Sequence, residues 1–153
     1  MCIAEDYLEH AMKASNVIYT ERCILDRPTP TDRDDVIRLQ TDSEVRRFLG
    51  GSVKVARAES RFLQILESDL DRYWAVRLKS DHMFVGLISL SSYHNQVDTE
   101  VSYEFLPEFW GNGFAAESVG AVIALTLEDA SIDRIVAETQ AVNLPSRRIL
   151  ERL

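Results

Sequence analysis

The chain has 153 residues, 46% of them hydrophobic and 27% charged, which suits a single globular domain with one core. Its formal net charge of -8 argues against general nucleic-acid binding, because that activity needs a basic surface. No apolar run approaches the roughly 20 residues that cross a bilayer, and the N-terminus lacks the basic and apolar regions of a secretory signal. We therefore expect one cytoplasmic domain over residues 1–153 that binds neither nucleic acid nor a membrane.

The acidic charge mildly favours cationic partners such as amines, although solubility alone also accounts for it. The two cysteines and three histidines stand in no metal-ligand spacing, so we expect no bound metal.

The spacing of apolar residues changes several times along the chain, and each change marks the border of a predicted element. Apolar residues three or four apart predict helices, whereas alternation of apolar and polar residues predicts strands. The first predicted element is an extra N-terminal helix at 3–12, within the segment 1–16. The elements that follow in chain order are a strand at 17–25, a helix from 31, a helix at 54–69, strands at 73–78, 83–91 and 100–106, a helix at 114–129, a strand at 135–137 and a helix from 143.

The order of these elements predicts the fold class. Polar turns between the three consecutive strands imply antiparallel hairpins. The segment 101–139 runs strand, helix, strand, which implies a right-handed crossover between parallel strands. Together they predict an α+β fold with a mixed sheet and helices on both of its faces.

The turn between the strand at 100–106 and the helix at 114–129 has the features of an anion-binding site. It carries the sequence PEFWGNGFAAE at 107–117, in which Gly111 and Gly113 can adopt positive φ and let the backbone approach a bulky phosphate. The first N–H groups of a helix lack internal partners, and the helix dipole adds roughly half a positive charge there. The turn therefore predicts a phosphate-bearing ligand.

Several stretches in a fixed order resemble the GNAT superfamily of acyl-CoA-dependent N-acyltransferases, and most closely its ribosomal-protein alanine acetyltransferase (RimJ/RimL-like) branch. They are TERCIL at 20–25, SEVRRFL at 43–49, VGLISL at 85–90, EVSYEFLPEFWGNGFAAE at 100–117, RIVAE at 134–138 and NLPSRRILERL at 143–153. The resemblance implies the GNAT fold and transfer of an acetyl group from acetyl-CoA to a primary amine. That amine would be a protein N-terminus or a small amine, and it would attack the thioester directly.

The same resemblance implies a set of cofactor-binding residues. The pantetheine arm of acetyl-CoA would pair with the strand end at Phe105 and Leu106, and Asn143 would hydrogen-bond an amide of that arm. Backbone donors would stabilise the oxyanion. The pyrophosphate would rest on the turn formed by Trp110, Gly111, Asn112, Gly113, Phe114 and Ala115.

Three residues are candidates for the chemistry. Glu100 is the first candidate for the base that deprotonates the amine, Glu138 is the second, and Ser146 would lie near the departing sulfur. Alternation places Glu100, Ser102 and Glu104 on one polar face of their strand, which suits a wet substrate cleft. A solvated strand end is the alternative explanation for Glu100.

Some residues allow two interpretations that the sequence leaves open. Asn143 and Ser146 are equally suited to capping the last helix, and one residue can serve both roles. Arg46, Arg47 and Arg61 either contact an anionic group of the acceptor or simply carry surface charge, and surface charge is the favoured interpretation.

The chain departs from the family at its C-terminus, because it ends at Leu153 where relatives continue into a two-strand hairpin. We therefore expect the GNAT fold without that hairpin and an exposed edge strand at 135–139, covered by the N-terminal helix or by a second copy in a homodimer. A catalytically impaired acyl-CoA-binding protein is the alternative function. A nucleotide-binding protein is disfavoured, since no P-loop lysine follows the glycines.

Overall fold

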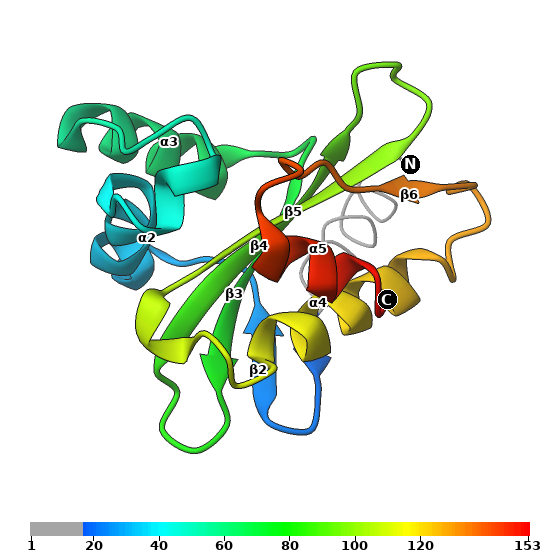
Figure 1. The fold of residues 1–153 in the computed structure, drawn as a ribbon, viewed down its shortest axis with the longest axis horizontal. Coiled ribbons are helices and arrows are strands. Elements are labelled where there is room, and N and C mark those ends of the chain that lie inside the picture. Colours follow the sequence, from blue (N-terminus) through cyan, green and yellow to red (C-terminus); the bar gives the residue numbers. More distant parts are fainter. Residues whose placement is uncertain (1–16) are drawn as a thin grey trace, which may run out of the picture.

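The structure of the chain, a computed structural model, describes residues 17–153 (Figure 1). The helix predicted at 3–12 lies outside this part of the chain. No helix within residues 17–153 has the length and apolar character needed to span a membrane. The strands are β1 (Ile18–Tyr19), β2 (Cys23–Asp26), β3 (Arg72–Leu78), β4 (Phe84–Ser92), β5 (Thr99–Phe105) and β6 (Ile135–Val136). The helices are α2 (Arg33–Thr41), α3 (Val55–Glu67), α4 (Phe114–Thr126) and α5 (Leu144–Leu150), with short 3-10 helices η1 (Pro30–Asp32), η2 (Val45–Phe48) and η3 (Pro107–Phe109).

The strands form one mixed sheet in the order β1-β2-β3-β4-β5-β6. Neighbouring strands are antiparallel except β5 and β6, which run parallel because helix α4 connects them. Helices α2 and α3 lie on one side of the sheet, and α4 and α5 lie on the other (Figure 1). The predicted α+β fold, with a mixed sheet and helices on both faces, is confirmed.

Each face of the sheet has its own hydrophobic core. On one face, Val119 of α4 packs with buried side chains of the sheet, including Trp74, which is 3% exposed. On the other face, Leu39 of α2 and Phe62 of α3 pack against Leu87. Each large apolar side chain buried in this way contributes about 1.5–3 kcal/mol to stability. The two cores hold β5 between two helical layers.

The strand predicted at 17–25 is instead a tight hairpin of β1 and β2. Ile18 pairs with Leu25 in antiparallel register, so the chain reverses between the two strands. The turn is closed by Thr20, whose N–H donates to the carbonyl of Cys23 at 3.0 Å and whose hydroxyl accepts the N–H of Cys23 at 2.9 Å. The single-strand prediction is wrong because alternation continues through the turn and no glycine or proline marks it.

A β-bulge interrupts β4. Its pairing with β3 slips by one residue at Val85, which is left as an extra residue. As a result Phe84 and Leu87, three positions apart, both pack in the core beside α2 and α3. Ideal alternation would place two such residues on opposite faces.

The glycine that follows the bulge allows β4 and β5 to approach closely. Gly86 lies directly opposite Phe105 of β5. A Cβ at Gly86 would lie 2.7 Å from the carbonyl oxygen of Glu104 and 2.7 Å from the Phe105 ring, which is closer than real contacts allow. The absence of a side chain at Gly86 therefore determines where the Phe105 ring lies at the end of β5.

We expect Gly86→Ala to destabilise the fold by about 1–3 kcal/mol, the usual cost of overpacking, because the added methyl group meets backbone. Gly120→Ala is the matched control, because its Cβ meets only the side-chain end of Leu153, at 3.0 Å, and alanine favours helix α4 by about 1 kcal/mol. Urea unfolding of the two variants measures the difference. Equal stabilities would contradict the close approach of β4 and β5.

Candidate active site

The glycine turn joins β5 to α4 through two left-handed residues. Gly111 has a φ of +76° and Gly113 a φ of +82°, a region that glycine adopts without strain. Gly113 caps α4, and its carbonyl accepts the N–H of Glu117 at 3.0 Å. The N–H groups of Phe114 and Ala115 precede this first helical bond, so they have no partner within the helix. They lie at the positive end of α4, which attracts anions.

Arg22 of the β1–β2 hairpin holds this turn in place. Its guanidinium donates to the carbonyl of Asn112 at 2.9 Å and to the carboxylate of Glu117 at 2.8 Å, and it lies 4.5 Å from the centre of the Phe114 ring. Burial alone would raise the pKa of Glu117, but hydrogen bonds from Thr20 and Arg22 lower it below its ordinary value. The sequence does not predict this role for Arg22, because 90 residues separate it from Asn112 and no local pattern links them.

A second ion pair involves the acidic residue that precedes the turn. Arg38 of α2 donates to both carboxylate oxygens of Glu108, at 2.6 and 2.9 Å. These hydrogen bonds lower the pKa of Glu108. The negative charge of Glu108 is thus already balanced by a protein partner, which reduces its repulsion of an anion at the turn.

β5 loses its parallel partner early. Only Thr99 and Glu100 pair with β6, and the N–H of Thr99 donates toward the β6 side. Alternation turns the N–H groups of Tyr103 and Phe105 to this same side, where no strand of residues 17–153 pairs with them. The indole N–H of Trp110 donates to the carbonyl of Phe105 at 2.7 Å and so connects the turn to the end of this edge. The unpaired edge of β5 and the glycine turn form one continuous surface.

Leu106 differs from its neighbour Phe105 in its backbone. Its N–H donates to the carbonyl of Val85 on β4 at 2.9 Å, on the opposite side of the strand. Its side chain is buried in the core beside α2 and α3. Of the two strand residues expected to pair with the pantetheine arm, only Phe105 presents its backbone at the unpaired edge.

Two residues of the last helix contact this edge or support the contact. Ser146 Oγ lies 2.8 Å from the Tyr103 hydroxyl. Asn143 Oδ1 accepts the N–H of Ser146 at 3.3 Å, so the capping alternative for Asn143 is present in the structure. Burial raises the pKa of Tyr103 above its ordinary value, which keeps the phenol protonated at neutral pH. The Tyr103 hydroxyl can therefore either donate a hydrogen bond to Ser146 Oγ or accept one from it.

The two candidate bases lie near one tyrosine at the other end of the edge. Tyr93 donates a hydrogen bond to Glu138, and this bond, together with the charges of Glu138 and Glu100, raises the pKa of Tyr93. His94 Nε2 lies 3.9 Å from the carboxylate of Glu138. The Glu100 carboxylate makes no hydrogen bond to any residue of 17–153. Among residues 17–153, therefore, the Glu100 carboxylate has no hydrogen-bond donor, whereas Glu138 has Tyr93.

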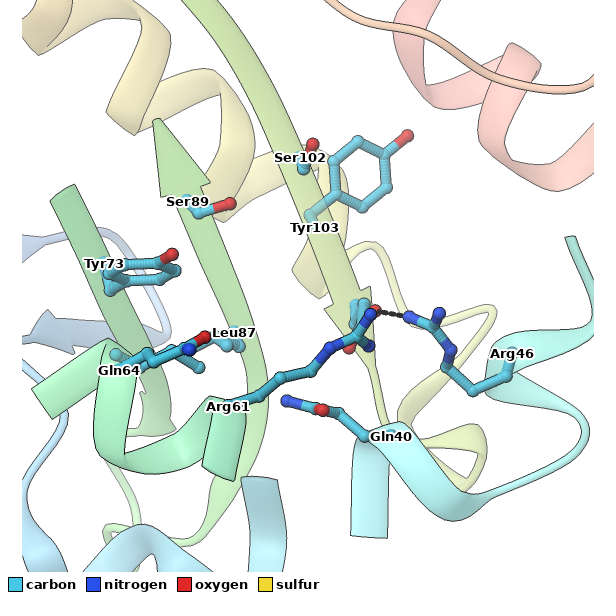
Figure 2. A pocket seen from close by; sticks show the side chains of 11 residues that line it. Gln40, Arg46, Arg61, Gln64, Tyr73, Leu87, Ser89, Ser102 and Tyr103 are labelled. Carbon is cyan, nitrogen blue, oxygen red and sulfur yellow. Dashed lines mark hydrogen bonds and ion pairs between the residues drawn. The ribbon is translucent and has the colours of Figure 1, made fainter. Parts of the chain in front are cut away.

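A cavity of about 270 Å³ lies on the face of β4 and β5 that α2 and α3 cover (Figure 2). Ser102 and Glu104 of the predicted polar face line it, whereas Glu100 does not. Glu104 accepts a hydrogen bond from Arg46 at 2.7 Å, and burial raises the pKa of Glu104 against the effect of the Arg46 charge. Arg46 is only 9% exposed, so its interpretation as surface charge is wrong.

The fold is that of the GNAT acetyltransferases. The sequence model of the acetyltransferase (GNAT) domain matches residues 22–153, and the chain belongs to this family. A curated relative, the N-acetyltransferase YnaD of Bacillus subtilis, is 23% identical over 136 residues, which span 89% of this chain and 80% of the relative. The chain is accordingly an N-acetyltransferase, an enzyme that transfers an acetyl group to an amine.

Solved structures share the fold at low sequence identity. A GNAT acetyltransferase from Bacillus anthracis has a TM-score of 0.79 and 23% identity, over 89% of this chain and 81% of that one. The spermidine N-acetyltransferase of Vibrio cholerae, in complex with CoA and spermine, has a TM-score of 0.72 and 14% identity, over 85% and 78% of the two chains. RimL, a ribosomal L7/L12 α-N-protein acetyltransferase, has a TM-score of 0.73 and 12% identity, over 90% and 78%.

The contact between Tyr103 and Ser146 is expected to couple β5 to α5 by about 1 kcal/mol, the net value of one hydrogen bond. Tyr103→Phe, Ser146→Ala and the double variant form a cycle that urea unfolding measures. Tyr73→Phe combined with Ser146→Ala is the control cycle, because Tyr73 bonds to Asp71 instead and should show no coupling. Strictly additive losses in the first cycle would show that the hydroxyl groups do not interact.

Proposed function

We propose that the chain takes its acetyl group from acetyl-CoA and transfers it to a primary amine by direct attack of that amine on the thioester. The observation that carries this proposal is the continuity of two binding surfaces. The unpaired edge of β5 leads through Trp110 to the glycine turn at the start of α4. Acetyl-CoA has an extended arm with two amides, which can hydrogen-bond to the edge of β5, and a pyrophosphate, which can bind at the glycine turn.

Specific residues would hold the cofactor on this surface. The backbone N–H groups from Gly111 to Ala115 bind the pyrophosphate, and Arg22 keeps their turn in shape. The N–H of Trp110 donates to the carbonyl of Pro107 at 3.1 Å, so Trp110 supports the turn instead of donating to the ligand. The backbone of Phe105 pairs with the amides of the pantetheine arm as an added strand would, with Leu106 fixing the end of β5 to β4. Asn143 donates its side-chain amide to the same arm while its Oδ1 caps α5.

The reaction needs a proton acceptor, an oxyanion donor and a partner for the leaving group. Acetyl-CoA supplies a thioester, whose carbon–sulfur bond breaks as the amine nitrogen bonds to the carbonyl carbon. Glu100 takes the proton that the amine loses. The N–H of Tyr103, an unpaired donor beyond the end of β6, hydrogen-bonds the carbonyl oxygen as negative charge develops there. Ser146 hydrogen-bonds the departing thiolate, which water protonates.

The sequence motifs also support membership in the RimJ/RimL-like branch, and a protein N-terminus and a small amine are the two candidate acceptors.

We also propose that the protein forms a homodimer through β6. β6 is an edge strand of the described sheet, and Ile135 and Val136 remain only half buried. A second copy that covers this edge would satisfy backbone groups that a lone sheet leaves open.

Acetyl-CoA is expected to raise the thermal midpoint of the protein. A ligand at about 100 times its dissociation constant adds about 2.7 kcal/mol, which moves the midpoint by several degrees. Gly111→Ala should weaken acetyl-CoA binding about tenfold or more, because it strains the turn that presents the N–H donors. Differential scanning fluorimetry over a range of acetyl-CoA concentrations measures both effects.

Gly50→Ala is the control for Gly111→Ala. Gly50 has a φ of +84° and, like Gly111, has nothing within 4 Å of an added Cβ, so both variants carry the same backbone strain. Only Gly111 belongs to the turn before α4. Equal acetyl-CoA affinities in the two variants, or no shift for the parent protein at millimolar acetyl-CoA, would contradict the cofactor site.

Turnover distinguishes the two candidate bases. Glu100→Gln should lower kcat by about 10²–10⁴, the usual contribution of general-base catalysis, and should leave the acetyl-CoA thermal shift unchanged. Glu138→Gln should lower kcat by less than about tenfold, because Tyr93 already occupies that carboxylate. Release of CoA in the presence of an amine panel is the readout. The reverse order would make Glu138 the base, and cofactor binding without any turnover in the parent protein would establish the impaired acyl-CoA-binding protein instead.

A further inference from the structure

The cavity over β4 and β5 is positively charged in an otherwise acidic chain. Its charged lining residues are Arg46, Arg61 and Glu104, two cations and one anion, so its net charge is +1 where the whole chain carries -8. Protonation of Glu104, which burial favours, would make the cavity more positive still. An anionic group is therefore attracted to this cavity, and a polycation is repelled.

The two arginines differ in whether the protein supplies hydrogen-bond acceptors for their guanidinium groups. Arg46 donates to Glu104 at 2.7 Å, to the carbonyl of Gly51 at 3.2 Å and to the carbonyl of Leu49, so its donors are used by the protein. Arg61 of α3 is half buried and has no hydrogen bond or ion pair with any residue of 17–153. Its positive charge acts electrostatically on Glu104 and opposes the rise in pKa that burial causes in that carboxyl group. Figure 2 shows Arg61 extending across the cavity toward the Arg46 side. The guanidinium N–H groups of Arg61 are therefore available to hydrogen-bond a ligand.

A second lining residue is buried with an unused polar atom. Gln40 of α2 is 5% exposed, and its Oε1 has no hydrogen-bond partner among residues 17–153. A buried polar atom without a partner costs about 1–3 kcal/mol, which a ligand that bonds to it would recover. In Figure 2 the Gln40 amide projects into the same space as Arg61. The protein thus leaves a cationic donor and a buried amide unsatisfied within one cavity.

We propose that this cavity binds the anionic end of the acceptor, so that the substrate is a small primary amine that also carries a carboxylate or a phosphate. Arg61 holds the anion through charge-assisted hydrogen bonds, and Gln40 bonds to a polar group of the same molecule. The inference rests on the proposed function, since it takes the cavity as the acceptor side of that site. It separates the candidate acceptors by charge and disfavours both polyamines and simple alkylamines.

The position of the cavity along β5 sets the spacing of the two groups. Ser102 lines the cavity between Glu104 and the candidate base Glu100. Two residues of a strand span about 7 Å. An anion that Arg61 holds at the Glu104 end of the cavity and an amine at the Ser102 end, toward Glu100, are therefore separated by several bonds. A volume of about 270 Å³ is suited to a molecule of amino-acid size.

Calorimetric binding to the protein, with and without saturating CoA, tests the inference. The ligands are matched pairs: straight-chain ω-amino acids of increasing length against alkylamines of equal length, and phosphoethanolamine against ethanolamine. We expect the anionic member of at least one pair to bind about tenfold tighter or more. Arg61→Met should remove that preference by about ten- to hundredfold, the value of a charge-assisted hydrogen bond, and Arg61→Lys should restore part of it.

The control is Arg57→Met, which removes the same charge from the exposed surface of α3 one turn earlier and should leave the preference intact. Equal binding of both members of every pair, tight binding of spermidine, or a preference that survives Arg61→Met overturns the inference. So does tighter binding of an acidic tetrapeptide than of every amino acid, which would point to a protein N-terminus. Because binding is the readout, selective binding without acetylation counts against the proposed function alone.

Discussion

The parallel pairing of β5 with β6 ends after two residues, and the candidate site depends on that early end. A strand that continues beyond its neighbour keeps its N–H and C=O groups in a fixed row but lacks partners for them. Here the row runs from beyond Glu100 to Phe105, where the Trp110 indole takes the last carbonyl. The two ends of this row adjoin different groups. The carboxylates of Glu100 and Glu138 lie near the Glu100 end, and the N–H groups at the start of α4 lie near the Phe105 end.

β5 contributes to both proposed binding surfaces. Ser102, Tyr103 and Glu104 all line the cavity under α2 and α3, and the Tyr103 hydroxyl also contacts Ser146 of α5. The proposed donor and acceptor sites therefore lie on one strand and share Tyr103. Gly86 tightens this arrangement, since it lets β4 press against β5 and fixes the ring of Phe105.

Local features of the site could be predicted from the sequence, and contacts between distant segments could not. The turn at Gly111 and Gly113 is set by residues within one short run, and the helix that follows has a clear apolar period. The burial of Arg46 is not predictable, because its partner Glu104 is 58 residues away and a pair of adjacent arginines suggests solvent exposure. The sequence does not reveal the β1–β2 hairpin, because its turn is closed by a threonine hydroxyl, with no glycine or proline to mark it.

The Arg22 contacts make the glycine turn part of a composite structure built from two distant segments of the chain. The residues of the turn are contiguous, but the side chain that braces them comes from the first hairpin, 90 positions earlier. In a chimaera between two family members, any crossover between residues 22 and 112 separates the brace from the turn. Such hybrids would retain the glycine motif in their sequence. The turn would be rigid only in hybrids whose two parents both have the arginine and its partners.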